Sequence, residues 1–108
     1  MMLLNLTPHQ IQVHKGDKVE VIEPFGIVPR VENEYYETRK VNGVPILTRK
    51  TIKTANLPQP QTNVLYIVSN IVRLENLHRK DLISPSGQFR DENNKVIGCT
   101  SFIGNDEI

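Results

Sequence analysis

The sequence predicts a β-rich α+β domain with six or seven short, mostly antiparallel strands and one short helix. Polar and apolar residues alternate along several stretches, which is the period of half-buried strands. Turn-forming pairs such as Asn-Gly and Gly-Asp separate these stretches, as they do in β-hairpins. One continuous apolar run, 64–68, is followed by a stretch with helical spacing. Because aromatic residues make up only 6% of the chain and Trp is absent, the core must consist mainly of Val, Ile and Leu.

The N-terminal part predicts a hairpin and one further strand. Two alternating segments flank the turn pair Gly16-Asp17. We expect the apolar residues of this hairpin to share one face; they are Ile11, Val13, Val19 and Val21. A third strand is expected to hold Ile27, Val28 and Val31. Pro29 would mark an edge or a bulge there, because proline cannot donate a ladder hydrogen bond.

The middle of the chain predicts a second hairpin. The pair Asn42-Gly43 favours a type I′ turn, in which both central residues have positive φ. We therefore expect a strand over 34–41 to pair with a strand over 44–53. The proline-rich segment 57–61 cannot continue a sheet, so it should form the connection that follows.

The last third predicts a strand, a helix and a final hairpin. The β-branched run 64–68 is typical of a central strand buried on both faces. Ser69 or Asn70 can cap the short helix that follows it. The helix residues expected to face the core are Ile71, Leu74 and Leu77. Beyond the helix we expect a turn at Pro85-Ser86-Gly87 and a hairpin that joins 88–91 to 95–101.

Length and charge bound the organisation and the partners. A chain of 108 residues suits a single domain, which we expect over 1–103 with a flexible tail over 104–108. The net charge of +1, from 13 basic and 12 acidic residues, gives no long-range attraction to nucleic acid or membrane. No segment reads as a signal peptide or as a membrane span, so we expect a cytoplasmic protein.

The sequence contains no recognisable catalytic, cofactor or metal motif. Its six glycines form neither of the glycine-rich phosphate loops. Ser69 lacks the glycine-flanked elbow of a nucleophilic serine. The single cysteine, Cys99, is better explained as a small buried apolar residue than as a nucleophile. His14 and His78 have no partners at metal-ligand spacing. We therefore expect no enzymatic activity, no cofactor and no metal. An enzyme that used His9 or Cys99 would need those residues to meet in a cleft.

Several short motifs together resemble a family of small uncharacterised proteins from phages, prophages and bacterial mobile elements. They are Asn5-Leu6-Thr7-Pro8-His9, Pro24 with Arg30-Val31, Leu57-Pro58, Tyr66-Ile67-Val68-Ser69, Arg79-Lys80-Asp81-Leu82, and Pro85 with Arg90-Asp91 and Gly98-Cys99. The resemblance spans nearly the whole chain, although the middle, 32–56, carries little of it. It implies a mobile-element setting in a host cytoplasm rather than an activity. The stretch 84–87 departs from the plainer Pro-Gly that the family pattern would have.

Three arginines are the main candidates for ligand binding. Arg30, Arg79 and Arg90 come from different segments and could converge on a small anion such as a nucleotide phosphate, since a guanidinium binds such groups with two parallel hydrogen bonds. The alternative is structural. Arg79 lies beside Asp81 and Arg90 beside Asp91, so ion pairs could instead tie the helix exit to the last hairpin.

Four further residues complete the candidate ligand site. His9 and Asn5 would shape the mouth of a pocket, although the Thr-Pro-His motif is explained as well by hydrogen bonds to neighbouring backbone. Tyr35 or Tyr36 could stack on a base, and alternation predicts that one lies in the core or at an interface and the other in solvent.

Two functional hypotheses follow from these residues and the resemblance. The first is a non-enzymatic phage or prophage binding protein that counters host defence by sequestering a nucleotide-derived immune signal. The second is a protein–protein interaction module, either an inhibitor of a host protein or a virion-assembly accessory, that uses an edge strand or the 32–43 hairpin. This second hypothesis predicts an exposed apolar patch and no arginine-lined pocket. In both cases short edge strands and a thin core predict a homo-oligomer.

Overall fold

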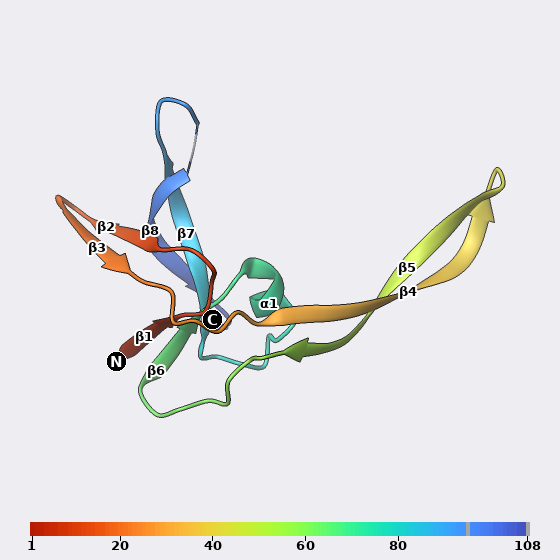
Figure 1. The fold of residues 1–108 in the computed structure, drawn as a ribbon, viewed down its shortest axis with the longest axis horizontal. Helices are drawn as coiled ribbons and strands as arrows, with labels where there is room; N and C mark the ends of the chain where they lie inside the picture. Colours follow the sequence, from red (N-terminus) through yellow and green to blue (C-terminus); the bar gives the residue numbers. More distant parts are fainter. Residues whose placement is uncertain (95, 108) are drawn as a thin grey trace.

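The computed structural model describes residues 1–94 and 96–107, which form eight strands and one short helix (Figure 1). In chain order the elements are β1 (Met2–Asn5), β2 (Ile11–Lys15), β3 (Lys18–Ile22), β4 (Arg30–Val41), β5 (Val44–Ala55), β6 (Val64–Ile67), α1 (Asn70–Leu74), β7 (Leu82–Arg90) and β8 (Val96–Gly104). Six strands make one sheet in the order β1-β6-β7-β8-β2-β3, and β4 pairs only with β5 in a second sheet. The predicted second strand of the last hairpin began at residue 95, which lies outside the described residues.

The predicted fold class is confirmed in its broad terms. The protein is rich in β-structure, it has one short helix, and antiparallel ladders join most of the paired residues. The predicted number of strands, six or seven, was too low, because the described residues form eight strands, which divide into two sheets. The larger sheet is also mixed, since β6 runs parallel to β1 and β7, and β2 runs parallel to β8. A parallel neighbour needs a long crossover, and the segment that holds α1 provides one between β6 and β7.

The core of the larger sheet lies on both sides of β6, as the apolar run predicts. Tyr66 belongs to one cluster of buried residues and Ile67 to another, because successive side chains of a strand point to opposite faces. The first cluster consists of Leu6, Tyr66, Val68, Val72 and Leu82. The second consists of Ile11, Val13, Ile67, Ile83 and Cys99. Burial of apolar side chains on both faces makes this sheet the stable part of the protein.

The first hairpin forms at the predicted turn, but its faces differ from the prediction. A two-residue turn pairs Lys15 with Lys18, which places Val13 opposite Glu20 and leaves Val19 opposite His14. Val19 and Val21 therefore lie on the other face from Ile11 and Val13 and are exposed. The turn length sets the register of a hairpin, and a shift of one residue moves every side chain to the opposite face.

The second hairpin forms a long arm (Figure 1). Asn42 and Gly43 have φ values of 52° and 79°, as a type I′ turn requires, so the predicted turn is confirmed. Its strands are longer than predicted, with twelve residues each. The expected third strand at Ile27 and Val28 does not form, because β4 begins only at Arg30. We call β4, β5 and their turn the arm, and the remaining described residues the body.

The arm extends the protein well beyond the size of a compact domain. At about 3.3 Å per residue, each of its strands is about 40 Å long. The radius of gyration is 17.1 Å, whereas a compact chain of this length would have about 13 Å. Figure 1 shows the arm leaving the body on one side, with its turn far from the large sheet.

The helix and the segment after it differ most from the sequence prediction. Ser69 caps α1 as expected, since its hydroxyl accepts a hydrogen bond from the backbone N–H of Val72. However, Val72 is the apolar helix residue that enters the core. The residues predicted to do so are exposed; they are Ile71, Leu74 and Leu77. A helix of five residues is too short for a spaced apolar stripe, so one inward position suffices.

Two further predictions about the C-terminal third were wrong. The expected turn at 85–87 is an extended part of β7, in which Pro85 pairs with Phe102. The expected tail from residue 104 onward also begins too early, because Gly104 still belongs to β8 and Asn105 is only 5% exposed. The final residue, 108, lies outside the described residues.

Candidate functional site

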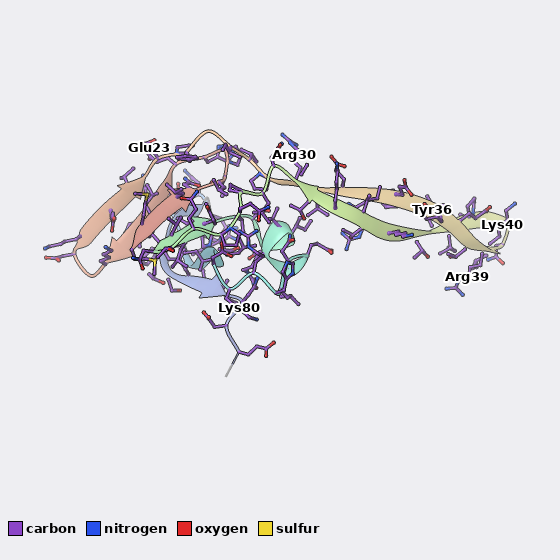
Figure 2. The ribbon with its side chains drawn as sticks, turned by 90° about the horizontal axis from the view of Figure 1, so that it is seen from below. Glu23, Arg30, Tyr36, Arg39, Lys40 and Lys80 are labelled. Atoms are coloured by element: carbon purple, nitrogen blue, oxygen red, sulfur yellow. The ribbon has the colours of Figure 1, made fainter. Side chains whose placement is uncertain are left out.

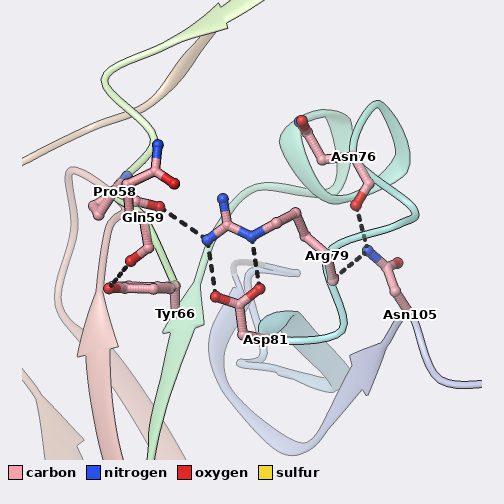
Figure 3. Close-up of polar contacts among 7 residues, drawn as sticks. All are labelled: Pro58, Gln59, Tyr66, Asn76, Arg79, Asp81 and Asn105. Carbon is pink, nitrogen blue, oxygen red and sulfur yellow. Dashed lines mark hydrogen bonds and ion pairs between the residues drawn. The ribbon is translucent and has the colours of Figure 1, made fainter. Parts of the chain in front are cut away.

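Arg79 and Asp81 form a bidentate ion pair beside the start of β7 (Figure 3). The Nε and Nη2 atoms of Arg79 donate to the two carboxylate oxygens of Asp81, each at 2.8 Å. Both side chains are largely buried, with 13% and 16% exposure. These hydrogen bonds, stronger than the opposing effect of burial, lower the pKa of Asp81 and raise that of Arg79.

The Arg79–Asp81 pair also holds the connection that returns from the arm to the body. Nη2 of Arg79 donates a further hydrogen bond to the carbonyl of Pro58, at 2.9 Å. The hydroxyl of Tyr66 donates to the next carbonyl, that of Gln59, also at 2.9 Å (Figure 3). Proline has no backbone N–H, so a proline-containing segment has fewer backbone donors with which to join its neighbours. Hydrogen bonds from side chains to the carbonyls of this segment hold it in place instead. The geometry therefore favours the structural role that the sequence left open for Arg79.

Asn105 fixes the same region from the C-terminal side. Its side-chain Nδ2 lies 3.1 Å from three backbone carbonyls, those of Arg73, Asn76 and Arg79. Figure 3 shows the contacts with Asn76 and Arg79. Two of these carbonyls also accept local backbone hydrogen bonds, that of Arg73 from the N–H of Asn76 at 3.2 Å and that of Asn76 from the N–H of Arg79 at 2.9 Å. Asn105 thus ties the exit of α1 to the end of β8. No sequence pattern pointed to this role, because the partners are backbone atoms about thirty positions away.

Arg90 and Arg79 lie at opposite ends of β7, and Arg30 lies on another element, β4. Arg90 ends β7, and its Nη1 donates to the carbonyl of Asn94 at 3.0 Å. Eight residue steps separate it from Leu82 at the other end of that strand, which corresponds to about 26 Å. Arg30 begins β4 and is exposed near the base of the arm (Figure 2). The structure therefore does not bring Arg79 and Arg90 together at one small anion.

Asn5 is buried at the end of β1, where it joins three segments of the body. Its Nδ2 donates to the carbonyls of His9 and Ile22, at 2.9 and 3.1 Å. Its Oδ1 accepts from the backbone N–H and the hydroxyl of Thr7. The backbone carbonyl of Asn5 also accepts from the N–H of Phe25 at 2.8 Å. These contacts connect β1 to both ends of the β2–β3 hairpin, so Asn5 has a structural role in the body.

His9 is exposed and takes part in this network through its backbone carbonyl. The hydroxyl of Thr7 donates to that carbonyl at 3.0 Å, which is the backbone arrangement that the Thr-Pro-His motif also allowed. His9 therefore lies at the surface next to the Asn5 network, and its contribution to that network comes from its backbone carbonyl and not from its imidazole.

The two adjacent tyrosines lie on opposite faces of the arm. Their exposures are 62% for Tyr35 and 49% for Tyr36, so the expectation that one of them is buried in the core is not met within this chain. Tyr36 donates a hydrogen bond to the carboxylate of Glu34, which raises the pKa of the Tyr36 hydroxyl. Figure 2 shows Tyr36 on the distal part of the arm with Arg39 and Lys40.

Cys99 is a core residue. Its side chain is buried in the second cluster, beside Val13 in the parallel ladder between β2 and β8. Burial raises the pKa of the Cys99 thiol, which disfavours the thiolate that a nucleophile needs. Among residues 1–94 and 96–107, no group of three or more His, Cys, Asp or Glu side chains could hold a metal ion.

A shallow concavity lies where the arm joins the body. Its volume is about 470 Å³, and it is open to solvent. It is lined by Gly26, Ile27, Val28, Asn56, Leu57 and Pro58. Its lining is mainly apolar and contains no arginine, so it lacks the charged groups with which a phosphate would be bound.

The arm carries an exposed apolar surface in the hairpin region that the protein–protein interaction hypothesis pointed to, although the sequence did not name its residues. In its ladder Val41 pairs with Val44, and Leu47 and Tyr36 lie close to that end of the ribbon. All four are exposed. The register places Tyr36, Val41 and Val44 on one face of the ribbon and Leu47 on the other. We call the surface formed by Tyr36, Val41 and Val44 the distal arm surface. One signal was available: the strand expected over 34–41 has no aliphatic residue before Val41, so it could not contribute a side to the core.

The arm also differs from the body in charge. Residues 30–55 hold six basic and three acidic side chains, a net charge of +3. The rest of the chain holds seven basic and nine acidic side chains, a net charge of −2. The near-neutral total therefore hides an asymmetry between the two parts. Such an asymmetry influences association between molecules rather than the fold.

Contacts with α1 hold the base of the arm in a defined direction. Glu75 pairs with Arg49 at 2.8 Å and accepts a hydrogen bond from Thr51 at 3.2 Å. The neighbouring Asn76 donates to the hydroxyl of Thr54 at 2.9 Å. All three arm partners lie on β5, so the helix exit supports one strand of the ribbon. The arm thus projects from a fixed base, and its distal half lies free of the body (Figures 1 and 2).

Comparisons with protein-family models, with curated proteins and with solved structures find no match for this chain. In the part of the chain that the structure describes, no helix has the length and apolar character needed to cross a membrane.

Proposed function

We propose that the protein is a non-enzymatic protein-binding module that presents the arm to its partner. The observation that carries the proposal is the distal arm surface, which places three large side chains, Tyr36, Val41 and Val44, in solvent on one face of the distal part of a ribbon about 40 Å long. An isolated two-stranded ribbon is marginal in water, and a long exposed apolar surface of this kind marks an interaction site. The mobile-element setting that the family resemblance implies would suit a virion-assembly accessory or an inhibitor of a host protein.

The contacts at the base of the arm support the same proposal. Arg79, Tyr66 and Asn105 all donate hydrogen bonds to backbone carbonyls of the segments around the arm base. Figure 3 shows two of these bonds at the connection that holds Pro58 and Gln59. A binding element that is held rigidly loses less conformational freedom when its partner binds. The hydrogen bonds of these residues therefore hold the arm in a fixed direction for docking, which is a role that requires no bound ligand.

Sequestration of a nucleotide-derived signal remains a prediction with less support from the geometry. It requires Arg79 to donate hydrogen bonds to a phosphate group. However, Nε and Nη2 of Arg79 already donate to the carboxylate of Asp81 and the carbonyl of Pro58. Dialysis of the purified protein against candidate cyclic nucleotides tests it directly. Retention of a nucleotide that is lost in Arg30→Ala would revive this hypothesis against the one proposed here.

Site-specific photocrosslinking in the producing cells tests the proposed function. A photoreactive residue at Val44, on the distal arm surface, is expected to give a defined crosslinked protein band. The same residue at Val19, which is similarly exposed on β3 of the body, serves as the matched control and is expected to give none. Crosslinking from position 44 no stronger than from position 19 would contradict the proposal.

A further inference from the structure

The strand register divides the arm into two faces with different surroundings. Arg49 and Thr51 of β5 share one face, and both contact Glu75 at the exit of α1. The opposite face carries the distal arm surface, because successive side chains of a strand alternate between faces. From the tip its cross-strand pairs are Val41 with Val44, Arg39 with Ile46, and Tyr36 with Thr48. The second pair therefore places a charged side chain among the apolar ones.

Arg39 is exposed on the distal part of the arm (Figure 2). Its side chain forms no hydrogen bond or ion pair with any residue in 1–94 or 96–107. Arg49 lies in the same tripeptide, Thr-Arg-Lys, on the other strand, and its guanidinium binds the carboxylate of Glu75 at 2.8 Å. Glu34, the acidic residue on the face of Arg39, instead accepts a hydrogen bond from Tyr36. Arg39 thus lacks the carboxylate that its counterpart on β5 has.

A partner that covers the apolar residues around Arg39 must also cover its guanidinium. Arginine remains protonated in proteins, so its burial without an acceptor leaves an uncompensated charge. That loss of hydration opposes the gain from the neighbouring apolar contacts. A carboxylate removes the opposition, because its two oxygens match two parallel N–H groups of the guanidinium. Binding on this face therefore requires an acidic group opposite Arg39.

We infer that the partner of the arm is a protein with an aspartate or glutamate surrounded by apolar residues, and that this carboxylate pairs with Arg39. The inference rests on the proposed function, because it describes the protein that the distal arm surface binds. Val41, Val44 and Ile46 can pack on any apolar surface, whereas Arg39 excludes a surface that has no acidic group. Arg39 is therefore the residue of the arm that determines which partner is accepted.

The charge of the arm is concentrated around the same residues. Segment 36–50 holds four basic side chains and one acidic side chain, a net charge of +3. The two basal segments, 30–35 and 51–55, together hold two of each and are neutral. Since Arg49 is bound to Glu75, the cations left for a partner are Arg39, Lys40 and Lys50. A positive potential of this kind accelerates the approach of an acidic protein and helps to orient it.

Nucleic acid is also acidic, but it fits this surface less well than an acidic protein does. Binding to a duplex relies on many contacts with phosphates, and the distal arm has only three cations that are not already paired within the described residues. A phosphate backbone also offers no apolar counterpart to Val41, Val44 and Ile46. A protein surface can supply the carboxylate and the apolar contacts together.

Photocrosslinking from position 44 in the producing cells tests the inference when it is combined with substitutions of Arg39. Arg39→Gln removes the charge and should weaken the crosslinked band by at least about tenfold. Arg39→Lys keeps the charge without the planar fork and should give an intermediate band. Lys18→Gln, the control, makes the same change of charge at an exposed position of β3 and should leave the band unchanged. All these positions are exposed, so circular dichroism should show folded proteins.

The crosslinked protein provides the second measurement. Mass spectrometry identifies it and maps the site of the crosslink, next to which we expect an aspartate or glutamate. Conversion of that residue to its amide should weaken the binding of the purified partner to the wild-type arm by at least about tenfold. The same conversion should have little effect on binding to Arg39→Gln, because both substitutions remove one and the same pair.

Four results would overturn the inference. They are a band of full strength in Arg39→Gln, an equal loss in Lys18→Gln, independent effects of the two substitutions on binding, and a crosslinked product that nuclease digests. The first of these would leave the proposed function standing, because the arm would still dock on a protein. The absence of any band from position 44 would refute the proposed function and the inference together.

Discussion

The arm and the larger sheet are both made of strands with alternating side chains, but they use the alternation differently. In β6 only four residues, Val64–Ile67, supply side chains to two buried clusters on opposite faces. In the arm, strands of twelve residues leave almost every side chain exposed beyond the base. β6 has a neighbour along both edges and layers on both faces, whereas β4 has one neighbour and no covering layer over its distal half.

This difference teaches that the length of a strand says little about its contribution to stability. Burial of apolar area is the main favourable contribution to folding, and the arm buries little of it. The arm is instead maintained by its turn, its ladder and a few polar contacts at its base. We therefore expect substitutions to affect folding strongly in the body and weakly in the arm, where they should affect association.

The largest difference is expected between two leucines. Leu82→Ala removes a side chain with 0% exposure from the first core cluster and should lower the free energy of unfolding by about 2–5 kcal/mol. Leu47→Ala on the arm, the matched control, should change it by less than about 0.5 kcal/mol. Urea unfolding followed by circular dichroism measures both. Equal losses would mean that the arm is buried in the folded protein and would contradict the comparison.

A smaller difference is expected between two asparagines. Asn5→Ala takes the side-chain partner from the carbonyl of Ile22 and the N–H of Thr7, removes one of the two side-chain hydrogen bonds to the carbonyl of His9, and should cost about 2–4 kcal/mol. Asn33→Ala on β4 removes only a contact with the hydroxyl of Thr51 and should cost less than about 1 kcal/mol. The same unfolding experiment compares the two. If Asn5→Ala is as stable as the wild type, its role in the body fold is refuted and a ligand role becomes the better explanation.

Asp81→Asn tests the ion pair beside the arm base. Loss of the carboxylate leaves Arg79 largely buried without its countercharge and should cost about 2 kcal/mol at pH 7. The folded-state pKa of Asp81 is lowered, so its contribution is complete above the unfolded pKa of 3.8 and is lost as the pH falls below that value. The variant should therefore lose less stability than the wild type between neutral pH and about pH 3. Parallel pH profiles would show that another group is responsible.

The smallest effect is expected at the joint between α1 and the arm. Glu75→Ala removes the partner of Arg49 and Thr51, an exposed contact that should contribute less than about 1 kcal/mol to global stability. Its main result should be faster amide hydrogen exchange over β5, with β6 unchanged, because only local opening becomes easier. Glu20→Ala, which removes a surface pair with Lys15 on the body, is the control and should leave β5 protected. Unchanged exchange in Glu75→Ala would mean that the helix does not hold the arm.

Local signals predicted the elements that depend on local chemistry. The Asn42-Gly43 turn, the cap at Ser69 and the two-sided burial of 64–68 each follow from a few neighbouring residues. The adjacency of Arg79 and Asp81 also pointed to a clamp, although its target, the carbonyl of Pro58, could not be found from spacing.

Predictions failed where partners far along the chain decided the outcome. Pro85 was assigned to a turn, but β7 pairs with β6 only at Leu82 and Ile83, so from Ser84 onward that side of β7 has no ladder to interrupt. Proline is tolerated at such an unpaired edge. The end of the domain was placed too early for a similar reason. The partners of Asn105 are backbone carbonyls near α1, which no pattern at the C-terminus reveals.

The sequence by itself determined that the protein is β-rich, where its turns and its central strand lie, and that it carries no catalytic or metal motif. Those properties follow from neighbouring residues, whose conformational preferences act over a few positions. Only the tertiary structure decided that the strands divide into a body and an arm, and that the side chains of Arg79 and Asn5 form hydrogen bonds with backbone carbonyls inside the fold. It also decided which apolar side chains stay in solvent, because burial depends on which strands become neighbours and not on the residues that flank them.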